Sequence, residues 1–409
     1  MELEAKKKLD LAAIASIPVI MTLANSMLIP VLPLMEKKLD ISSLQSSLII
    51  TVYAATAIVC IPFAGYLSDR LGRKKVIIPS LILAAIGGLI SGLAAWLLKD
   101  SAYWVILIGR FVQGIGAAGS FPIVLPLVGD MFKREEDVSA GLGMIETSNT
   151  FGKVLSPILG AALALIVWYM PLLIIPPVCL ISIIAVWLLV KVPANTDSDS
   201  DEKNIRAFLQ QIKEIFGHSG KWLTAIFVIG GISMLVLFGV LFYLSSILED
   251  KHDIDGVYKG MILAVPLLAV CLASFLTGKW IGQRKRLMKW LTFLALAILT
   301  AAMALSAHFN GSNLWVLISL ASISGIGIGA ALPCLDALIT EGIDKKQRGT
   351  ITSLYSSMRF IGVAAGPLLT SVLMKHELAM FYTFASMSLV AGLFALFAIK
   401  PESEQGQSK

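Results

Sequence analysis

Charged side chains occur inside several long apolar stretches of this chain. An ionised side chain at the centre of a lipid bilayer costs about 3 kcal/mol on insertion scales, so such residues usually mark a substrate or ion pathway. A carboxylate there can carry a proton, and a cation can hold a substrate of opposite charge. The residues of this kind are Arg110, Glu146, Lys153, Asp336 and Arg359.

Two of these residues share a helical face with an amide. Glu146 and Lys153 are seven residues apart, about two helical turns, and Asn149 lies between them. An internal repeat aligns Arg359 with Asn149, and both cations fall near the centres of their stretches. An ion pair with Glu146 could offset the cost of placing these cations in the bilayer. A substrate that brings negative charge is the other possibility, and the excess of central cations over central acids favours it.

The carboxylates of Glu146 and Asp336 are the candidates for proton carriers. A carboxyl group in an apolar cavity can hold a proton near neutral pH, as a carrier must. For Asp336 the alternative is an acid at a helix end that pairs with a cytoplasmic lysine. We include Arg110 with these two residues in the predicted proton-coupling set.

Further residues are expected to line the substrate cavity. The first apolar stretch offers Asn25 but no acid, which disfavours a cationic substrate. Aromatic side chains could form an adaptable apolar wall, although each could instead pack in the protein or face lipid. The residues in this group are Phe238, Phe242 and Tyr355.

Composition places the chain in the membrane. Apolar residues make up 57% of it, charged residues 15%, and the mean hydropathy is +0.83, which a soluble fold of this length could not bury. The net charge of +6 does not indicate nucleic-acid binding, because the basic residues lie in short loops. The four cysteines stand singly in apolar stretches, so we expect neither a metal site nor a cofactor.

About twelve stretches are long enough to cross a bilayer as helices, which predicts an all-α membrane protein. An even number places both termini on one side, and the basic loops place that side in the cytoplasm. The stretches are Leu11–Met35, Gln45–Leu67, Val76–Leu98, Tyr103–Val128, Ala140–Val167, Pro171–Val190, Trp222–Leu248, Tyr258–Ile281, Trp290–Ala307, Leu314–Ile339, Ile351–Met374 and Met380–Ile399.

Two similar halves are predicted, with a long loop between them. Gly114-Ile-Gly-Ala-Ala recurs as Gly327-Ile-Gly-Ala-Ala, and the Gly152…Pro157 pattern recurs around Pro367. We therefore predict six-helix bundles at residues 1–192 and 222–409, with the substrate between them near mid-membrane. The linker, 193–221, is expected to contain an amphipathic helix that lies on the inner leaflet or packs on the protein.

A basic hairpin joins the second and third stretches. We expect its glycines to allow close backbone approach and its acid to supply a counter-charge. We also expect Asp130 to pair with Arg70 or Arg73 as a latch at the inner gate. The motif residues are Gly65, Asp69, Arg70, Gly72 and Arg73.

This hairpin resembles the hallmark loop of the major facilitator superfamily, with Lys74 also matching. Arg110 and Gln113 are similar to a second signature, whose arginine the resemblance implicates in proton coupling. The stretch from Gly141 resembles the family's antiporter signature, although Ser156 and Ala161 stand where that pattern has glycine. Gly152, Pro157 and Gly160 match the pattern, and with the small residue Ser156 they form the antiporter-type motif.

The resemblance implies a proton-driven exporter of small amphipathic molecules, of the twelve-span drug/proton antiporter branch. A sharper hypothesis is an anionic substrate, such as an organic acid, a siderophore or an anionic lipid, that binds Lys153 and Arg359. Alternatives are proton-symport uptake and a receptor that does not transport. We find no nucleophile–base pair in the sequence and do not expect an enzyme. We expect a monomer in a bacterial plasma membrane.

Overall fold

The computed structural model describes residues 2–98, 101–131, 135–190, 205–281, 284–309, 313–342 and 345–399. Within these ranges, the side chains of 2–8, 69, 135–140, 142–143, 146, 205–219, 340–342 and 345–350 lie outside the description. The described elements are helices: α1 Glu2–Ser26, η1 Ile29–Val31, α2 Leu32–Leu39, α3 Ser43–Leu71, α4 Arg73–Leu97, α5 Ala102–Ala118, α6 Phe121–Met131, α7 Glu135–Ile166, α8 Met170–Leu173, α9 Ile175–Leu189, α10 Ile205–Asp250, α11 Gly256–Ile281, α12 Lys285–Phe309, α13 Leu314–Gly342, α14 Lys345–Leu373, η2 Met374–His376 and α15 Glu377–Phe397.

The described residues contain 11 helical segments long and apolar enough to cross a membrane. The last of them, Ile351–Phe397, is 47 residues long, about twice what one crossing needs. It contains α14 and α15, which the short turn η2 separates. The all-α membrane fold is therefore confirmed, and this double segment accounts for the predicted twelfth span.

The linker prediction needs one correction. Residues 193–204 lie outside the described part of the chain, as do the side chains of the expected amphipathic face. From Ile205 onward the backbone forms one 46-residue helix, α10, which includes the seventh span. The expected linker helix is thus continuous with that span rather than a separate element, and no proline interrupts the helix between Ile205 and Asp250.

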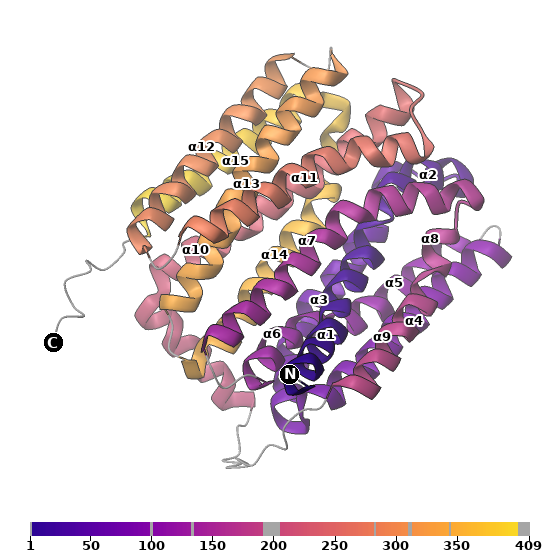
Figure 1. Ribbon diagram of the computed structural model, residues 1–409. Coiled ribbons are helices and arrows are strands. Elements are labelled where there is room, and N and C mark those ends of the chain that lie inside the picture. The colour runs from indigo at the N-terminus through magenta and orange to yellow at the C-terminus, as the bar shows by residue number, and fades with distance from the viewer. Residues whose placement is uncertain are drawn as a thin grey trace.

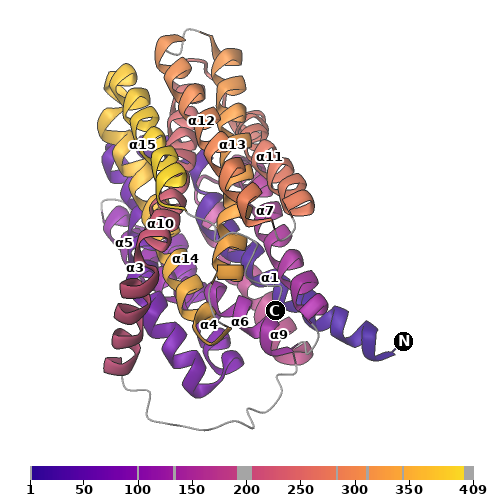
Figure 2. The ribbon, with the colours of Figure 1, turned by 90° about the vertical axis from the view of Figure 1, so that its left-hand side faces the viewer.

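The helices form two neighbouring groups, which we call the N-terminal half (α1–α9) and the C-terminal half (α10–α15) (Figure 1). In the first, α1 packs on α7 and α4 on α5; in the second, α10 packs on α14 and α12 on α13. The halves meet where α3 packs on α14 and α7 on α11. Figure 2 shows the helices running roughly parallel, as bundles that cross a membrane together must.

Glycines bring the backbones of matched helices into contact. A Cβ added at Gly160 of α7 would overlap the carbonyl oxygen of Met27, at the end of the first span. A Cβ added at Gly362 of α14 would overlap the carbonyl oxygen of Gly231 in α10. Only glycine permits these approaches, so matched helices of the two halves pack in the same close way, although Gly160 and Gly362 are not matching positions of the sequence repeat.

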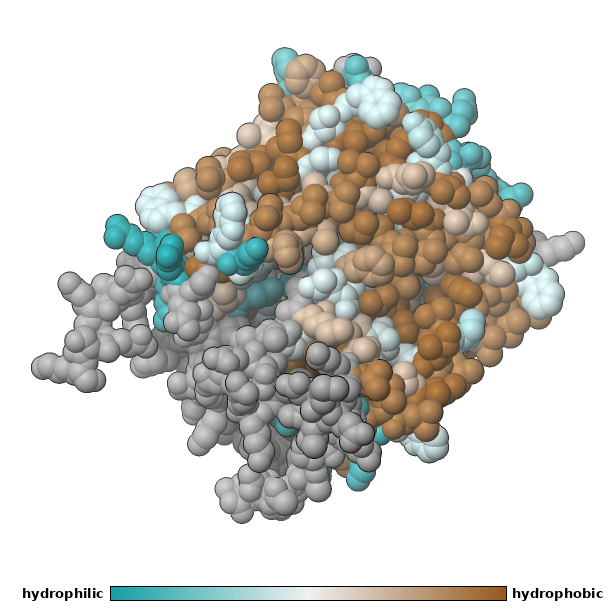
Figure 3. All heavy atoms as spheres, viewed as in Figure 1, coloured by the Kyte–Doolittle hydropathy of each residue, from teal (hydrophilic) through white to brown (hydrophobic). Residues whose placement is uncertain are grey.

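Apolar side chains also cover the outside of the molecule. In Figure 3 hydrophobic residues form a broad area over the helices, and hydrophilic residues gather near the helix ends. Exposed large apolar side chains of the described residues include Phe63, Trp187 and Leu272. Such a surface suits lipid rather than water, which agrees with the apolar length of the helices.

Candidate transport site

Arg110 is completely buried in the N-terminal half, where α5 meets α1 and α3. Its Nε donates to the carbonyl oxygen of Ile49 at 2.9 Å, and Nη1 donates to that of Ala24 at 3.0 Å. Nη2 donates to Asn25 Oδ1 at 2.6 Å, and Nη1 also donates to Gln113 Oε1.

Through these contacts the Arg110 guanidinium connects α5 to α1 and α3. The Tyr53 ring completes the surroundings of Arg110, with its centroid 4.4 Å from Cζ. Backbone carbonyls with no free donor nearby are well satisfied by the five N–H groups of an arginine. Arg110 and Asn25 thus form one polar cluster within the N-terminal half, and the role of Arg110 in proton coupling stays a prediction.

Lys153 lies where the two halves meet. It is 9% exposed, and with Ser26 and Phe238 it lines a small cavity between α7, the end of the first span, α10 and α11. The other lining residues are Ile29, Pro157, Leu241, Leu263 and Leu267, all apolar. The structure therefore places a cation in a largely apolar seam between the halves.

The other predicted residues of α7 have different surroundings. Asn149 is buried, and its Oδ1 accepts a hydrogen bond from the Thr22 hydroxyl of α1 at 2.7 Å. The side chain of Glu146 lies outside the described residues, so its predicted roles are not addressed by the structure. Asn149 contributes to the α1–α7 contact rather than pointing alone into an open cavity.

Arg359 and Asp336 meet in the C-terminal half. Arg359 Nη1 of α14 lies 3.8 Å from Asp336 Oδ1 of α13. The arginine side chain is 17% exposed and the aspartate side chain 40% exposed. Asp336 therefore has Arg359 as an ion-pair partner. The sequence had suggested two roles for Asp336, a proton carrier or a helix-end acid that pairs with a cytoplasmic lysine.

The predicted aromatic residues are all buried. Tyr355, one helical turn before Arg359, places its ring centroid 5.7 Å from the guanidinium carbon. Its ring also lies 5.9 Å from that of Phe227 in α10. Phe238 and Phe242 are 5% and 1% exposed, and Phe238 reaches the cavity beside Lys153. Tyr355 and Phe238 thus each accompany one of the two predicted substrate-binding cations.

The hairpin between α3 and α4 contains the expected ion pair. Arg73 Nε lies 3.1 Å from Asp130 Oδ2, and Arg73 Nη1 donates to Ser68 Oγ at 2.7 Å. Both partners belong to the N-terminal half, so this pair joins α4 to α6 and does not bridge the halves. Arg70 is exposed, and the side chain of Asp69 lies outside the described residues.

The two hairpin glycines do not make the close approach we expected. No described atom lies within 4 Å of a Cβ added at Gly65 or Gly72. Gly72 has φ +99°, a conformation that side chains strongly disfavour, and it ends α3 and starts α4. Gly72 is therefore required by the turn itself, and its neighbour Lys74 anchors the hairpin by donating to the Trp187 and Val190 carbonyl oxygens at the end of α9.

The antiporter-type residues pack α7 against the first span. A Cβ at Gly152 would lie 3.2 Å from the Val19 carbonyl oxygen, and Gly160 lies against Met27. Ser156 is buried and donates to the Gly152 carbonyl oxygen at 2.6 Å, so a serine is accommodated where the family pattern has glycine. Pro157 lies on the opposite side of the helix, where its carbonyl oxygen contacts Gly260 of α11.

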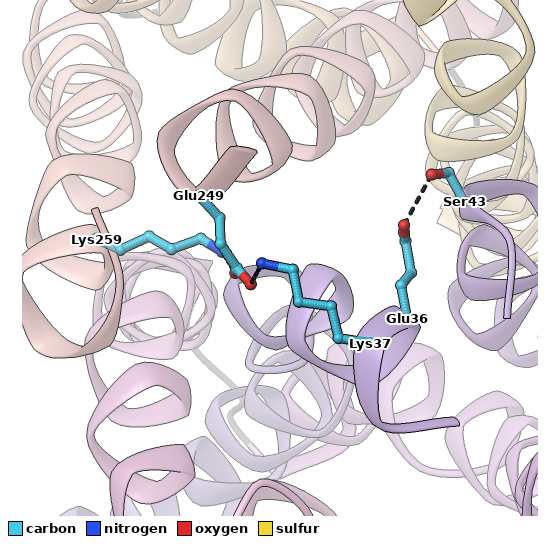
Figure 4. A network of polar contacts seen from close by, with 5 residues as sticks. All are labelled: Glu36, Lys37, Ser43, Glu249 and Lys259. Carbon is cyan, nitrogen blue, oxygen red and sulfur yellow. Dashed lines mark hydrogen bonds and ion pairs between the residues drawn. The ribbon is translucent and has the colours of Figure 1, made fainter. Parts of the chain in front are cut away.

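Sequence analysis did not single out the ionic network at the end of the molecule that contains α2. Glu249, near the end of α10, lies 2.8 Å from Lys37 of α2 and 2.9 Å from Lys259 of α11 (Figure 4). Lys259 is 2% exposed and Glu249 11% exposed. Nearby, Glu36 accepts hydrogen bonds from Ser43 and Ser46.

The Lys37–Glu249 pair connects the two halves. Three further hydrogen bonds do the same: Ser245 Oγ to the Ile29 carbonyl oxygen, Thr51 Oγ1 to that of Ala364, and a 3.4 Å contact between the Ser47 and Ser371 hydroxyls. These contacts lie toward the end of the helices that contains α2. A lysine in one terminal turn and an acid in another gave no pairing signal in the sequence, because the residues are 212 positions apart.

A family model described as Major Facilitator Superfamily matches residues 14–367 and 289–409. The chain belongs to this superfamily. Solved structures agree on the fold: the human organic anion transporter MFSD10 (TETRAN) superposes with a TM-score of 0.73 at 19% identity, over 95% of this chain and 99% of that one.

Several members of the superfamily are similar in sequence to this chain. The Bacillibactin exporter of Bacillus subtilis (strain 168) is 50% identical over 97% of this chain and 98% of that protein. Multidrug resistance protein MdtG of Serratia proteamaculans (strain 568) is 26% identical over 91% of this chain and 88% of that protein. The class E tetracycline resistance protein of Escherichia coli is 24% identical over 80% of this chain and 77% of that protein.

These findings settle the class of the protein. It is a multi-pass membrane transporter of the superfamily, similar to its drug-efflux members, and not an enzyme. The predicted family and branch are confirmed. In transporters built from such halves, the substrate binds between them and access alternates as one half rocks against the other.

Proposed function

We propose that this transporter exports organic anions from the cell in exchange for protons, and that bacillibactin is one of its substrates. The 50% identical relative named as a Bacillibactin exporter supports the direction and the substrate. The anionic class is supported by the cations that the structure places at and beside the contact between the halves.

The burial of Lys153 carries this proposal. Its side chain is buried and lines a cavity with Ser26, Phe238 and apolar residues at the seam between the halves. A positive charge in such a place attracts an anion much more strongly than the same charge does in water, because the local dielectric constant is low. Lys153 is thus the residue that an anionic substrate between the halves would meet.

The C-terminal half contributes a second cation to the proposal. Arg359 is partly exposed, and its planar guanidinium can bind a carboxylate or a similar group through two parallel hydrogen bonds. The neighbouring Tyr355 ring offers an apolar face to the organic part of a substrate. Lys153 and Arg359 belong to different halves, and the proposal is that one anion binds to both.

The proposed domain bounds, orientation, oligomeric state and proton carriers are those predicted from the sequence. We propose residues 1–192 and 222–409 as the rocking bundles, with the hairpin end of the protein in the cytoplasm of a bacterial cell and the monomer as the working unit. Proton exchange requires a titrating carboxylate, and the candidates are Glu146 and Asp336.

The test is uptake of bacillibactin into inside-out membrane vesicles energised by a proton gradient. We expect uptake by the wild type, abolition by a protonophore, and at least about a tenfold loss in Lys153→Gln, since a partly desolvated charge contact is worth more than about 1.4 kcal/mol. Lys38→Gln is the matched control, because Lys38 is an exposed lysine on α2.

Two outcomes would contradict the proposal in different ways. Absence of wild-type uptake would reject bacillibactin as a substrate. Uptake that is unchanged in both Lys153→Gln and Arg359→Gln would reject recognition of the anion by these two cations.

A further inference from the structure

The ion pair between Arg359 and Asp336 is looser than the other ion pairs of the described residues. Its nitrogen–oxygen distance is 3.8 Å. The other described pairs, at Lys37, Arg73, Lys251 and Lys259, have distances between 2.5 and 3.1 Å. A guanidinium and a carboxylate at 3.8 Å attract each other without forming a short, aligned hydrogen bond.

The pair is also partly open to its surroundings, although it belongs to apolar helices. The Asp336 side chain is 40% exposed and that of Arg359 is 17% exposed, whereas Arg110 in the other half is completely buried. An ion pair that is exposed to this degree can exchange one partner for a dissolved ion, because the two groups can separate without rearranging buried side chains.

Arg359 has support that does not depend on Asp336. The ring of Tyr355 lies 5.7 Å from its guanidinium carbon, and Tyr355 is itself held in place by burial and by contact with Phe227. The attraction between a guanidinium and an aromatic face persists when a carboxylate partner changes. Arg359 can therefore stay in position while its anionic partner is replaced.

We infer that Asp336 is a built-in competitor of the anionic substrate: its carboxylate occupies the anion-binding side of Arg359 until a substrate anion displaces it. This inference rests on the proposed function, because it assumes that Arg359 receives an anion. It makes Asp336 a residue that limits substrate affinity and favours release, so that the transporter does not hold its anion too tightly to discharge it.

This competition determines how protonation of Asp336 would affect binding of the substrate anion. Protonation of Asp336 would remove the competitor, so a proton at Asp336 and an anion at Arg359 support each other's binding, and linkage makes this reciprocal. Mutual support is what a symporter requires, whereas an antiporter needs ligands that exclude each other. If Asp336 is a competitor, the exchanged proton is carried elsewhere, and Glu146 is the remaining candidate within the predicted set.

The test compares binding affinities of purified wild-type and variant transporter. Bacillibactin is titrated against Asp336→Asn, which removes the competing charge but keeps the size of the side chain. We expect a two- to tenfold lower dissociation constant, roughly the strength of a loose, partly exposed ion pair together with the repulsion removed. Tighter binding is a gain that damage to the fold would not produce.

Glu377→Gln is the matched control. Glu377 is also a C-terminal-half carboxylate in an ion pair, with Lys251 at 2.5 Å, but it lies at the end of the molecule that contains α2 and away from Arg359. We expect its dissociation constant to equal that of the wild type. Arg359→Gln should weaken binding, and the double variant of Arg359→Gln with Asp336→Asn should bind no better than Arg359→Gln alone.

A second anion separates this inference from the proposed substrate. The same titrations are made with salicylate, a small aromatic carboxylate. If bacillibactin fails to bind every variant but salicylate binds more tightly to Asp336→Asn, the proposed substrate is wrong and the competitor role stands. If Asp336→Asn binds both anions no more tightly than the wild type does, the competitor role is wrong.

Discussion

Arg110 and Arg359 both stand well inside membrane-spanning helices, and the two halves of the protein use them differently. Arg110 in the N-terminal half donates to carbonyl oxygens of α1 and α3 and is fully buried. Arg359 in the C-terminal half faces one carboxylate at 3.8 Å and an aromatic ring, and it is partly exposed. The two arginines are not at equivalent positions of the repeat, because Arg110 belongs to α5 whereas Arg359 of α14 aligns with Asn149 of α7.

This difference separates a charge that holds the fold from a charge that can bind. The donors of Arg110 are directed at main-chain oxygens, which cannot move without moving a helix. Among the described contacts of Arg359, the charged partner is the Asp336 side chain, which can turn away. An intramembrane arginine is therefore informative about function only after its partners are known, although its cost in lipid is the same in both cases.

The largest effect should come from Arg110→Gln. The Ala24 carbonyl oxygen near the end of α1 and the Asn25 amide oxygen would lose their donors, and each such buried loss costs about 1–3 kcal/mol. The Ile49 carbonyl oxygen lies inside α3 and keeps its helical hydrogen bond. We expect the free energy of unfolding to fall by at least about 2 kcal/mol, seen as a lower melting temperature by tryptophan fluorescence in detergent.

Arg359→Gln provides the comparison within the same experiment. Its loose, partly exposed pair should contribute no more than about 1 kcal/mol, so the melting temperature should stay close to that of the wild type while anion binding is lost. Equal destabilisation by the two substitutions would show that the halves do not differ in the way we describe.

The next effect concerns the backbone packing that the halves share. Gly160→Ala in α7 would place a methyl group against the Met27 carbonyl oxygen, and Gly362→Ala in α14 would do the same against Gly231. We expect each to cost about 1–3 kcal/mol of unfolding free energy, because a rigid backbone must shift. The same melting measurement applies.

The control for this pair is Gly278→Ala in α11, where no described atom lies within 4 Å of an added Cβ. Alanine is the better helix former, so this variant should be unchanged or up to about 1 kcal/mol more stable. If all three variants melt alike, glycine contact is not what holds α7 and α14 in place.

The fold could be predicted from sequence because its signals are local and repeated. Apolar length identifies each span, and the recurrence of the Gly114 pattern at Gly327 identifies matching helices. The pairing of Arg73 with Asp130 was also predictable, because hairpin and span end lie on the same face of the membrane. The continuity of α10 was not, because the polar composition of the linker suggested a separate surface helix.

The partners of the charged residues could not be predicted in the same way. The hydrogen-bond partners of Arg110 were not predictable, since only the helix packing decides which carbonyl oxygens its donors reach. Asp336 and Arg359 were each singled out, but their contact depends on the rotation of α13 and α14 about their axes. For such residues the sequence predicts that a charge is placed in the membrane, and the packing determines what it contacts.

The smallest effect concerns the contact between the halves rather than either half alone. Lys37 of α2 pairs with Glu249 of α10 at 2.8 Å, but Lys37 is 58% exposed, so the pair is worth no more than about 0.2–1 kcal/mol. In Lys37→Gln the two halves should therefore separate at the α2 end only about two- to fivefold more often than in the wild type. Lys259, which is buried beside Glu249, keeps that carboxylate paired in the variant.

Accessibility of a cysteine reports this opening. Ser47 is completely buried beside Ser371 of the other half, so Ser47→Cys, with the four native cysteines replaced by alanine, should react with a membrane-impermeant maleimide only when the halves part. Adding Lys37→Gln should speed labelling two- to fivefold, Lys37→Arg should restore the slower rate, and Lys38→Gln should leave it unchanged. Equal rates for Lys37→Gln and Lys38→Gln would mean that the halves are held together by packing and the remaining hydrogen bonds, in which case polar side chains matter inside each half but not between them.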